Sequence, residues 1–301
     1  MTRLKLAKTA GTSIEKGSGM IIDTNHRTTT KLSGLAANGV TAIIRYYARF
    51  TQQREKRLIR SEAEAILNAG MSIAVVHQAA GDQAAAFSHD SGIADATYAR
   101  NYGAKVIGQP DGSAIYFAVD FDADQPEVNN RIVPYFQAVR SVLQSSDLLP
   151  KYKVGVYGDG VTLKTLLDGG LVEFTWISQS LGFPGTRQFK SSNRWTLFQQ
   201  YPPMKIDGLD HDVDDLNPAF TDFGAFHQLD SLPVISPRLV VKARAGLRLR
   251  AGPGTEFDVQ KVLPFGTEVS VVSRHGDFAA VDLNGDGAID GFVFAALLGE
   301  G

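Results

Sequence analysis

Aspartate residues follow three of the strand-like segments of this sequence. Asp23 ends the first segment, Asp120 and Asp122 end the fourth, and Asp210 and Asp212 end the last. Residues i and i+2 of a strand project to the same side, so we expect Asp120 and Asp122 to point together. Acid–base hydrolysis of a glycosidic bond uses two such carboxyl groups, and crowding keeps one of them protonated near neutral pH. The pattern predicts Asp122 as the acid, with Asp120 and Asp23 as stabiliser or base.

These aspartates also have a purely structural interpretation. Aspartates at strand ends often cap the next helix or brace a loop. The acidic run that contains Asp210 and Asp212 is equally typical of a solvated loop.

Other side chains are candidates for contacts with a sugar substrate. Tyr46, Tyr157 and Trp176 lie on predicted strands, and aromatic faces pack against sugar rings, although a role in the core is the more common one. His26 and Gln199 lie at or near strand ends. We expect these five residues, with Asp210 and Asp212, to bind the substrate.

Strand-like and helix-like segments alternate over residues 19–228. Such alternation predicts a TIM-like (β/α)8 barrel, which carries its active site at the C-terminal ends of the strands. The last two connections are too short for full helices, so irregularity is expected there. An open doubly wound sheet is the rival, but its nucleotide-binding forms have a glycine-rich first turn, which is missing here. The predicted strands are Met20–Asn25, Thr41–Ala48, Ser72–Gln78, Ala114–Phe121, Lys153–Asp159, Phe174–Ser180, Trp195–Tyr201 and Ile206–Asp212.

The residues before and after this region have different sequence patterns. Residues 1–18 are expected to form an irregular lead-in, and residues 229–237 a linker with two prolines. Residues 238–301 show short alternating segments with glycine turns, which predicts a small all-β barrel.

One motif in this second part resembles a calcium loop. Asp282, Asn284, Asp286 and Asp290 are spaced like the first oxygen ligands of such a loop. Position twelve would be Val293 rather than glutamate, so a plain β-hairpin is favoured and no metal site is predicted.

The second part resembles the bacterial SH3 family. The carrying segments are Gly246–Gly254 (GLRLRAGPG), Leu263–Thr267 (LPFGT) and Gly291–Val293 (GFV). This resemblance implies an SH3-like barrel, and members of the family often bind cell wall.

The first part resembles a glycoside-hydrolase-like domain related to family-25 lysozymes. The resemblance rests on Gly19–Asp23 (GMIID), Ile115–Asp122 (IYFAVDFD), Val154–Gly158 (VGVYG) and the aspartate-rich end. It implies an Asp on the first strand and an Asp-x-Glu on the fourth, where the Glu is the acid. Here Asp122 stands at that Glu position.

Together the two resemblances imply a peptidoglycan-directed, lysozyme-like glycosidase with a cell-wall-binding module, such as an endolysin or an antibacterial enzyme. The alternatives are a carbohydrate-binding pseudo-enzyme of the same fold and, least favoured, a metal-dependent hydrolase. No cofactor is expected.

Composition and charge narrow the remaining possibilities. The formal net charge of −2 gives no general attraction to nucleic acid. The apolar runs are of strand length, so membrane insertion is not expected. The first residues have no apolar core of a signal peptide, so we expect a chain made in the cytoplasm and released to the wall by a non-classical route, through phage lysis or as a delivered effector.

Overall fold

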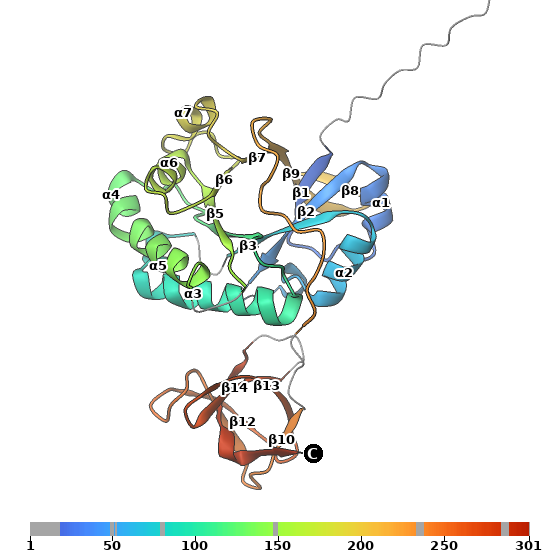
Figure 1. Ribbon diagram of the computed structural model, residues 1–301, viewed down its shortest axis with the longest axis vertical. Coiled ribbons are helices and arrows are strands. Elements are labelled where there is room, and N and C mark those ends of the chain that lie inside the picture. Colours follow the sequence, from blue (N-terminus) through green and yellow to red (C-terminus); the bar gives the residue numbers. More distant parts are fainter. Residues whose placement is uncertain are drawn as a thin grey trace, which may run out of the picture.

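We analysed a computed structural model of the 301-residue chain, which describes residues 19–48, 51, 53–78, 82–146, 150–232, 238–283 and 289–300. Figure 1 shows two bodies: a large α/β barrel, and below it a smaller all-β module formed by the end of the chain.

The barrel contains eight strands that close into a ring. The order is β1-β2-β3-β4-β5-β6-β7-β9, and β9 also pairs with β1. The predicted TIM-like barrel is therefore confirmed, and each of the first seven predicted segments contains a strand. The strands are β1 (Met20–Asp23), β2 (Val40–Tyr47), β3 (Ser72–His77), β4 (Ala114–Ala118), β5 (Lys153–Gly158), β6 (Phe174–Ile177), β7 (Leu197–Gln199), β8 (Met204–Ile206) and β9 (Leu209–Leu216).

The last strand departs from the prediction of an all-parallel barrel. β9 runs antiparallel to both β1 and β7. The predicted single strand Ile206–Asp212 is wrong, because a two-residue turn at Asp207-Gly208 divides it into the β8–β9 hairpin. Both turn residues have positive φ, 51° and 77°, as in the type I′ turns that favour Asp-Gly. No helix is needed to reverse the chain, which explains the short last connections.

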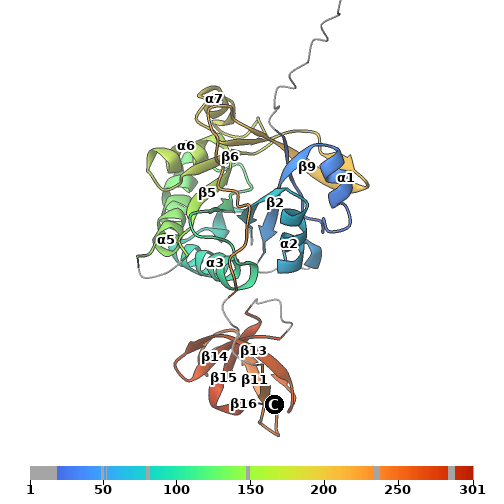
Figure 2. The same cartoon turned by 45° about the vertical axis from the view of Figure 1, so that its right-hand side comes forward.

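Helices cover the outside of the barrel (Figure 2). Residues His89–Tyr102 form α3, which is followed by a π-helical turn over Gly103–Ile107. A continuous helical stretch follows β4 and has three segments, Gln125–Glu127 (α4), the π-helical Val128–Ile132 and Val133–Leu143 (α5). The other helices are α1 (Leu32–Ala37), α2 (Arg60–Asn68), α6 (Gly160–Asp168) and α7 (Thr186–Ser191).

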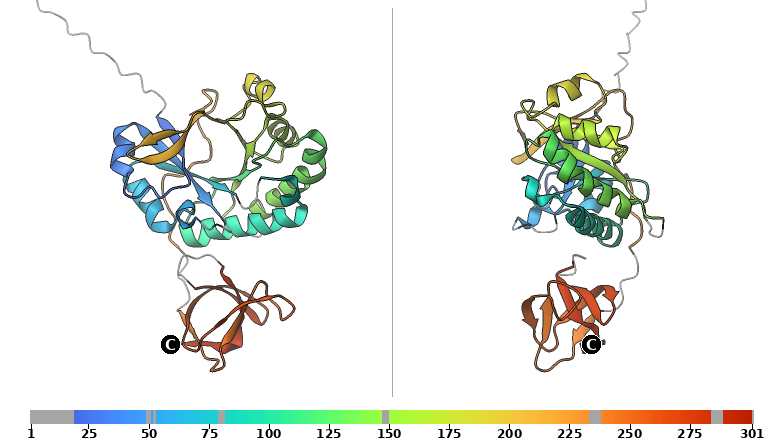
Figure 3. Two further views of the ribbon diagram at one scale, coloured as in Figure 1. Left: turned by 180° about the vertical axis from the view of Figure 1, so that it is seen from behind. Right: turned by 90° about the vertical axis from the view of Figure 1, so that its left-hand side faces the viewer.

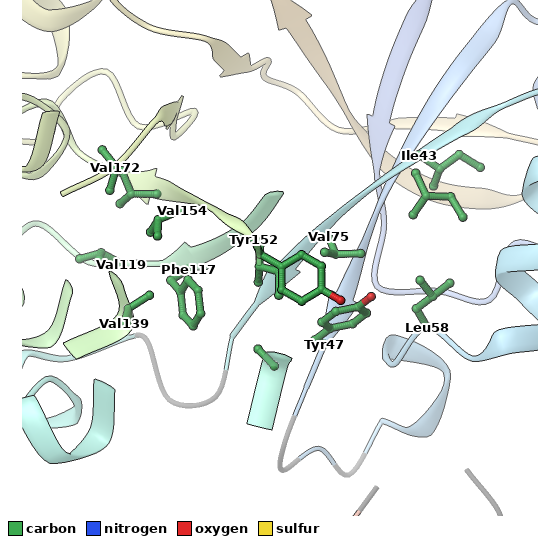
Figure 4. Packing of buried hydrophobic residues seen from close by; sticks show 14 of the residues in the cluster. Ile43, Tyr47, Leu58, Val75, Phe117, Val119, Val139, Tyr152, Val154 and Val172 are labelled. Carbon is green, nitrogen blue, oxygen red and sulfur yellow. The ribbon is translucent and has the colours of Figure 1, made fainter. Parts of the chain in front are cut away.

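Two apolar clusters stabilise the barrel. The larger one lies between strands and helices, and Figure 4 shows members such as Ile43, Val75 and Phe117 within it. The smaller one fills the barrel interior with Tyr116 and Trp176 among small residues, Ala42, Ala74, Ala114 and Ala118. Side chains alternate between these clusters along each strand, as the period of two requires.

The C-terminal module is one seven-stranded antiparallel sheet around its own core. The strand order is β12-β11-β15-β14-β13-β10-β16. The predicted SH3-like barrel is therefore confirmed. The strands are β10 (Leu239–Val241), β11 (Leu247–Arg250), β12 (Val259–Leu263), β13 (Glu268–His275), β14 (Phe278–Asp282), β15 (Gly291–Phe294) and β16 (Leu298–Glu300).

The segment between the two bodies begins as part of the barrel. The backbone N–H of Asp230 donates to the carbonyl of Gly108 at 2.8 Å, and Arg60 donates to the carbonyl of Asp230 at 2.9 Å. The last five residues of the predicted linker, residues 233–237, lie outside the described residues.

The β8–β9 turn gives a direct test of this architecture. Gly208 has open space around its α-carbon, so Gly208→Ala meets no steric clash and suffers only from the positive φ. We expect the free energy of unfolding to fall by on the order of 1 kcal/mol in urea titrations. Gly182→Ala is the matched control, since Gly182 also has open space but no positive φ. If the two variants were equally stable, the positive φ of Gly208 in this turn would be contradicted.

Candidate functional site

A pocket opens at the C-terminal mouth of the barrel, where an active site is expected in this fold. Its volume is about 170 Å³. Strands from all around the ring contribute to it, and most of its polar groups are carboxyls, amides or phenols. Its lining residues are Tyr46, Val76, Gln78, Ala118, Asp120, Tyr157, Trp176, Gln179, Gln199 and Asp212.

Gln199 links two carboxyl groups at the base of this pocket. Its Nε2 donates to Asp23 Oδ2 at 2.8 Å and to Asp212 Oδ2 at 3.2 Å. Its Oε1 accepts from the Tyr157 hydroxyl at 2.8 Å, and the Tyr46 hydroxyl donates to Asp23 Oδ1 at 3.3 Å. The five side chains form one hydrogen-bonded network, so the structure brings these predicted site residues together.

A third carboxyl group, that of Asp214, lies beneath this network. The indole Nε1 of Trp176 donates to Asp214 Oδ1 at 2.7 Å, and the other oxygen has no hydrogen-bond donor among the described residues. Asp214 is 3% exposed and Asp23 is 2% exposed. The two buried carboxyl groups interact electrostatically, because the charge of Asp23 acts on Asp214.

Burial and neighbouring negative charge raise the pKa values of both carboxyl groups. For Asp23, burial and then the charge of Asp212 raise the pKa to about 7, against the hydrogen bonds from Gln199 and Tyr46. For Asp214, burial and then the charge of Asp23 raise the pKa well above the ordinary value. Because two buried carboxylates cannot both ionise cheaply, the pair holds a proton near neutral pH.

Sequence reasoning missed Asp214, although a signal for it was present. The predicted last strand ended at Asp212, whereas β9 continues to Leu216. Asp212 and Asp214 are two residues apart on one strand and therefore share the inner face of the barrel. Recognising the Asp-Gly turn would have extended the strand and placed Asp214 inside.

Asp120 lies at the mouth of the pocket, above the network. The Gln78 side chain donates to Asp120 Oδ2 at 3.2 Å. Partial burial raises the pKa of Asp120, while Gln78 and the nearby Lys56 oppose that rise. Lys56 in turn donates to Gln78 Oε1 at 2.7 Å, so the carboxyl, amide and ammonium groups form a chain.

Asp122 does not line the pocket. Strand β4 ends at Ala118 rather than at the predicted Phe121, so Asp120 and Asp122 both lie on the following loop. The expectation that they project together from a strand is therefore wrong. Asp122 is exposed, and no hydrogen bond joins its side chain to another described residue.

The predicted aromatic residues occupy different depths. Tyr157 is partly exposed in the pocket, whereas Trp176 is 2% exposed and packs against Tyr157 with ring centroids 4.8 Å apart. Trp176 also packs against Tyr116 from below. The Trp176 indole therefore supports the floor of the pocket, and its ring is too buried to stack on a sugar.

Two predicted substrate contacts lie outside the pocket lining. The side chain of Asp210 is exposed in the β8–β9 hairpin and forms an ion pair with Lys205 at 3.0 Å. His26 follows β1 in a turn in which its backbone N–H donates to Thr24 Oγ1 at 3.2 Å.

The candidate calcium loop falls only partly within the described residues. Asn284 and Asp286 lie outside them. Asp282 is buried at the end of β14, and Asp290 Oδ2 accepts from the backbone N–H of Leu283 at 2.7 Å. Across the described part of the chain, no three acidic or histidine side chains are grouped as metal ligands.

Family comparisons agree with this architecture. A family described as "Rv2525c-like, glycoside hydrolase-like domain" matches residues 33–228, and the bacterial SH3 domain family matches residues 245–299. The resemblances inferred from the sequence are therefore confirmed.

Individual relatives are more distant. The uncharacterized protein YbfG of Bacillus subtilis is 36% identical over 144 residues, which are 46% of this chain. The match spans only 20% of the length of that relative.

Solved structures show the same barrel. The Tat-secreted protein Rv2525c of Mycobacterium tuberculosis is 24% identical, with a TM-score of 0.56 over 69% of this chain and 98% of that chain. An uncharacterized B. stearothermophilus protein is 14% identical, with a TM-score of 0.51 over 69% of this chain and 100% of that chain.

The similarity to Rv2525c corrects our expectation about localisation. Rv2525c is described as a Tat-secreted protein, and a secreted protein is exported from the cytoplasm. The expectation of a chain without a signal peptide that leaves the cell by a non-classical route is therefore wrong. Within the described residues, no helix is long and apolar enough to cross a membrane.

The buried pair predicts an unusual dependence of stability on pH. A carboxyl whose pKa is raised in the folded state keeps its proton between pH 4 and 7, where the unfolded chain has lost it. Wild-type stability therefore falls as pH rises through this window. In Asp214→Asn this fall should shrink by on the order of 1–3 kcal/mol, measured as urea unfolding at pH 5 and pH 8.

Asp215→Asn provides the control, since Asp215 is the neighbouring residue and is exposed. It should follow the wild-type pH dependence. If Asp214→Asn also followed it, the pair would not hold a proton.

Proposed function

Because the chain belongs to the Rv2525c-like, glycoside hydrolase-like family, we propose that its barrel hydrolyses a glycosidic bond of cell-wall glycan at the mouth pocket. The bacterial SH3 domain supports the same target, since it would keep the barrel at the wall.

The observation that carries this proposal is the position of carboxyl groups on opposite sides of the pocket. Asp120 follows β4 and Asp212 lies within β9, and these strands are separated by three strands in either direction around the ring. Glycoside hydrolysis requires two carboxyl groups that flank the scissile bond. A sugar placed between β4 and β9 would have one carboxyl on each side.

The environments of these carboxyls suggest separate roles. Asp120 has a raised pKa and faces solvent, so it suits the acid that protonates the leaving oxygen. Asp212 is held by Gln199 Nε2 and suits the base, nucleophile or stabiliser of the developing positive charge. The Asp23–Asp214 pair below adds negative charge close to the sugar ring. In this assignment Asp120 takes the acid role that was predicted for Asp122.

The size of the pocket indicates how much of a polymer it holds. Its volume of about 170 Å³ is below the ~300–1,000 Å³ of typical small-molecule pockets. One sugar unit or its substituent would enter, while the neighbouring units lie across the open mouth. The exposed Asp120 stands where such a chain would cross.

A second candidate function is glycan binding without cleavage. Asp122 occupies the position of the lysozyme acid yet lies outside the pocket lining. If Asp120 does not replace it, the pocket keeps its hydrogen-bonding groups for a sugar but has no acid.

We predict that Asp120→Asn reduces the release of soluble glycan from purified peptidoglycan by about 100-fold or more, which is the usual contribution of a general acid. Products are measured by mass spectrometry. Because Asp120 is exposed, the variant should unfold at the wild-type temperature. Asp122→Asn is the matched control and should retain activity.

The opposite result, loss of release in Asp122→Asn alone, would return the acid to Asp122 and contradict our assignment. No fragments from wild type, with the protein still sedimenting with the wall, would establish the binding function instead.

A further inference from the structure

Lys56 contacts two of the residues that line the mouth pocket. It ends a short helical turn, Arg54–Lys56, that follows β2 in the chain. Its Nζ donates to Gln78 Oε1 at 2.7 Å and lies 4.6 Å from the centre of the Tyr46 ring. Gln78 and Tyr46 line the pocket, whereas Lys56 does not. Lys56 therefore stands behind the pocket wall and contacts it through these two neighbours.

The backbone around Lys56 is fixed to β2 on both sides. On one side Arg45 Nη2 donates to the carbonyl of Glu55 at 2.6 Å, and on the other the Leu58 backbone N–H donates to a β2 carbonyl at 3.0 Å. Arg45 is itself buried and paired with Glu62 of α2 at 3.2 Å, and Figure 3 shows α2 alongside the blue strands of the barrel. Lys56 thus has a defined backbone position from which its side chain reaches Gln78.

The contact with Lys56 selects one orientation of the Gln78 amide. An ammonium group donates hydrogen bonds and cannot accept them, so it must meet the amide oxygen. The amide nitrogen is then directed at Asp120, and Gln78 Nε2 donates to Asp120 Oδ2 at 3.2 Å. Without the ammonium group, the amide is free to rotate and turn its oxygen toward the carboxylate. Lys56 therefore holds Gln78 as a donor to Asp120.

The charged and titratable groups around Asp120 are of both signs. Lys56 is the cation, Asp82 is a second carboxyl group, and the phenol of Tyr157 also interacts with Asp120. Burial has the largest effect and raises the pKa of Asp120, and Asp82 adds to that rise. Gln78 and Lys56 act in the opposite direction. The hydrogen-bonded chain therefore stabilises the carboxylate form against burial.

We propose that Lys56 is a positioning residue for the reaction assigned to Asp120. This inference rests on the proposed function, in which Asp120 gives its proton to the leaving oxygen and becomes a carboxylate. Through Gln78, Lys56 stabilises the carboxylate that this transfer produces. A general acid must hold its proton before the step and release it during the step, so both forms have to be accessible near the working pH.

The first test observes Asp120 directly and needs no catalytic activity. Carbon-13 NMR of the full chain with labelled aspartate side chains follows the Asp120 signal, assigned by its absence in Asp120→Asn, as pH is raised. Lys56→Met keeps the apolar stem and removes the charge, and we expect it to move the titration midpoint to higher pH by about 0.5–1 unit. Lys56→Arg retains the charge and the donors and should keep the wild-type midpoint.

A matched control removes a lysine elsewhere on the barrel. Lys151 is exposed and lies outside the pocket lining. Lys151→Met should leave the Asp120 midpoint unchanged, because exposed charges at a distance are screened by salt.

A variant of Gln78 separates the hydrogen-bonded chain from a direct effect of charge. Gln78→Met leaves the Lys56 ammonium group in place and removes the amide between it and Asp120. We expect the Asp120 midpoint to rise in this variant as well. If Lys56→Met does not fold, Gln78→Met carries the same expectation.

The pH profile of glycan release gives the second test. A general acid acts only while it is protonated, so release falls as pH rises through the pKa of the acid. In Lys56→Met this fall should move to higher pH by the same interval as the NMR midpoint, and Lys56→Arg should restore the wild-type profile. A wild type that releases no glycan would contradict the proposed function alone, because the NMR midpoint still decides whether Lys56 acts on Asp120.

Three results would overturn the proposal. The first is an Asp120 midpoint in Lys56→Met that equals the wild-type value or lies below it. The second is a rise in Lys56→Met together with a wild-type midpoint in Gln78→Met, since Lys56 would then act by charge without the amide. The third is an equal rise in Lys151→Met.

Discussion

The antiparallel insertion of β9 between β7 and β1 is the constraint on which the site depends. Its register places Asp212 opposite Asp23 on one neighbour and Asp214 opposite Gln199 on the other. Two carboxyls thus enter the barrel from a single strand and meet a third from β1. A parallel eighth strand would need a crossover of a dozen or more residues, whereas the Asp207-Gly208 turn reverses the chain with two.

This arrangement is maintained at a cost in stability. Two carboxyls are buried side by side, burial raises the pKa of both, and the charge of Asp23 raises that of Asp214 further. Hydrogen bonds from Trp176, Gln199 and Tyr46 offset part of that cost. The alanines of the barrel interior leave room for Trp176, whose indole both packs as core and donates to Asp214. Grouped carboxyl groups with shifted pKa values, kept although they lower the stability of the fold, are typical of functional sites.

Much of the fold followed from local patterns, and the errors have a common cause. The barrel and the SH3-type module were predicted because the period of hydrophobic residues and the turn signals are local properties. Asp23, Gln199, Tyr46 and Tyr157 were placed at one site because strand ends in a barrel converge. The direction of β9 and the end of β4 depend on pairing between distant segments. Those two features decide that Asp214 is inside and that Asp122 is outside.

Arg100 shows a different limit of sequence reasoning. Its position in the last turn of α3 is ordinary for an arginine. Only packing against the rest of the barrel and the module reveals that its guanidinium is buried without an acceptor. A local pattern cannot show a missing partner.

The proton held between Asp23 and Asp214 is the central claim of this account. Carbon-13 NMR of a chain with labelled aspartate side chains observes each carboxyl group directly as pH is raised. We predict that one or both carboxyl signals of the pair move only near pH 7 or above, and that the late-moving signal changes when Asp23 is replaced by Asn. If every aspartate signal completed its change below pH 5, the pair would be fully ionised at neutral pH and the account would be contradicted.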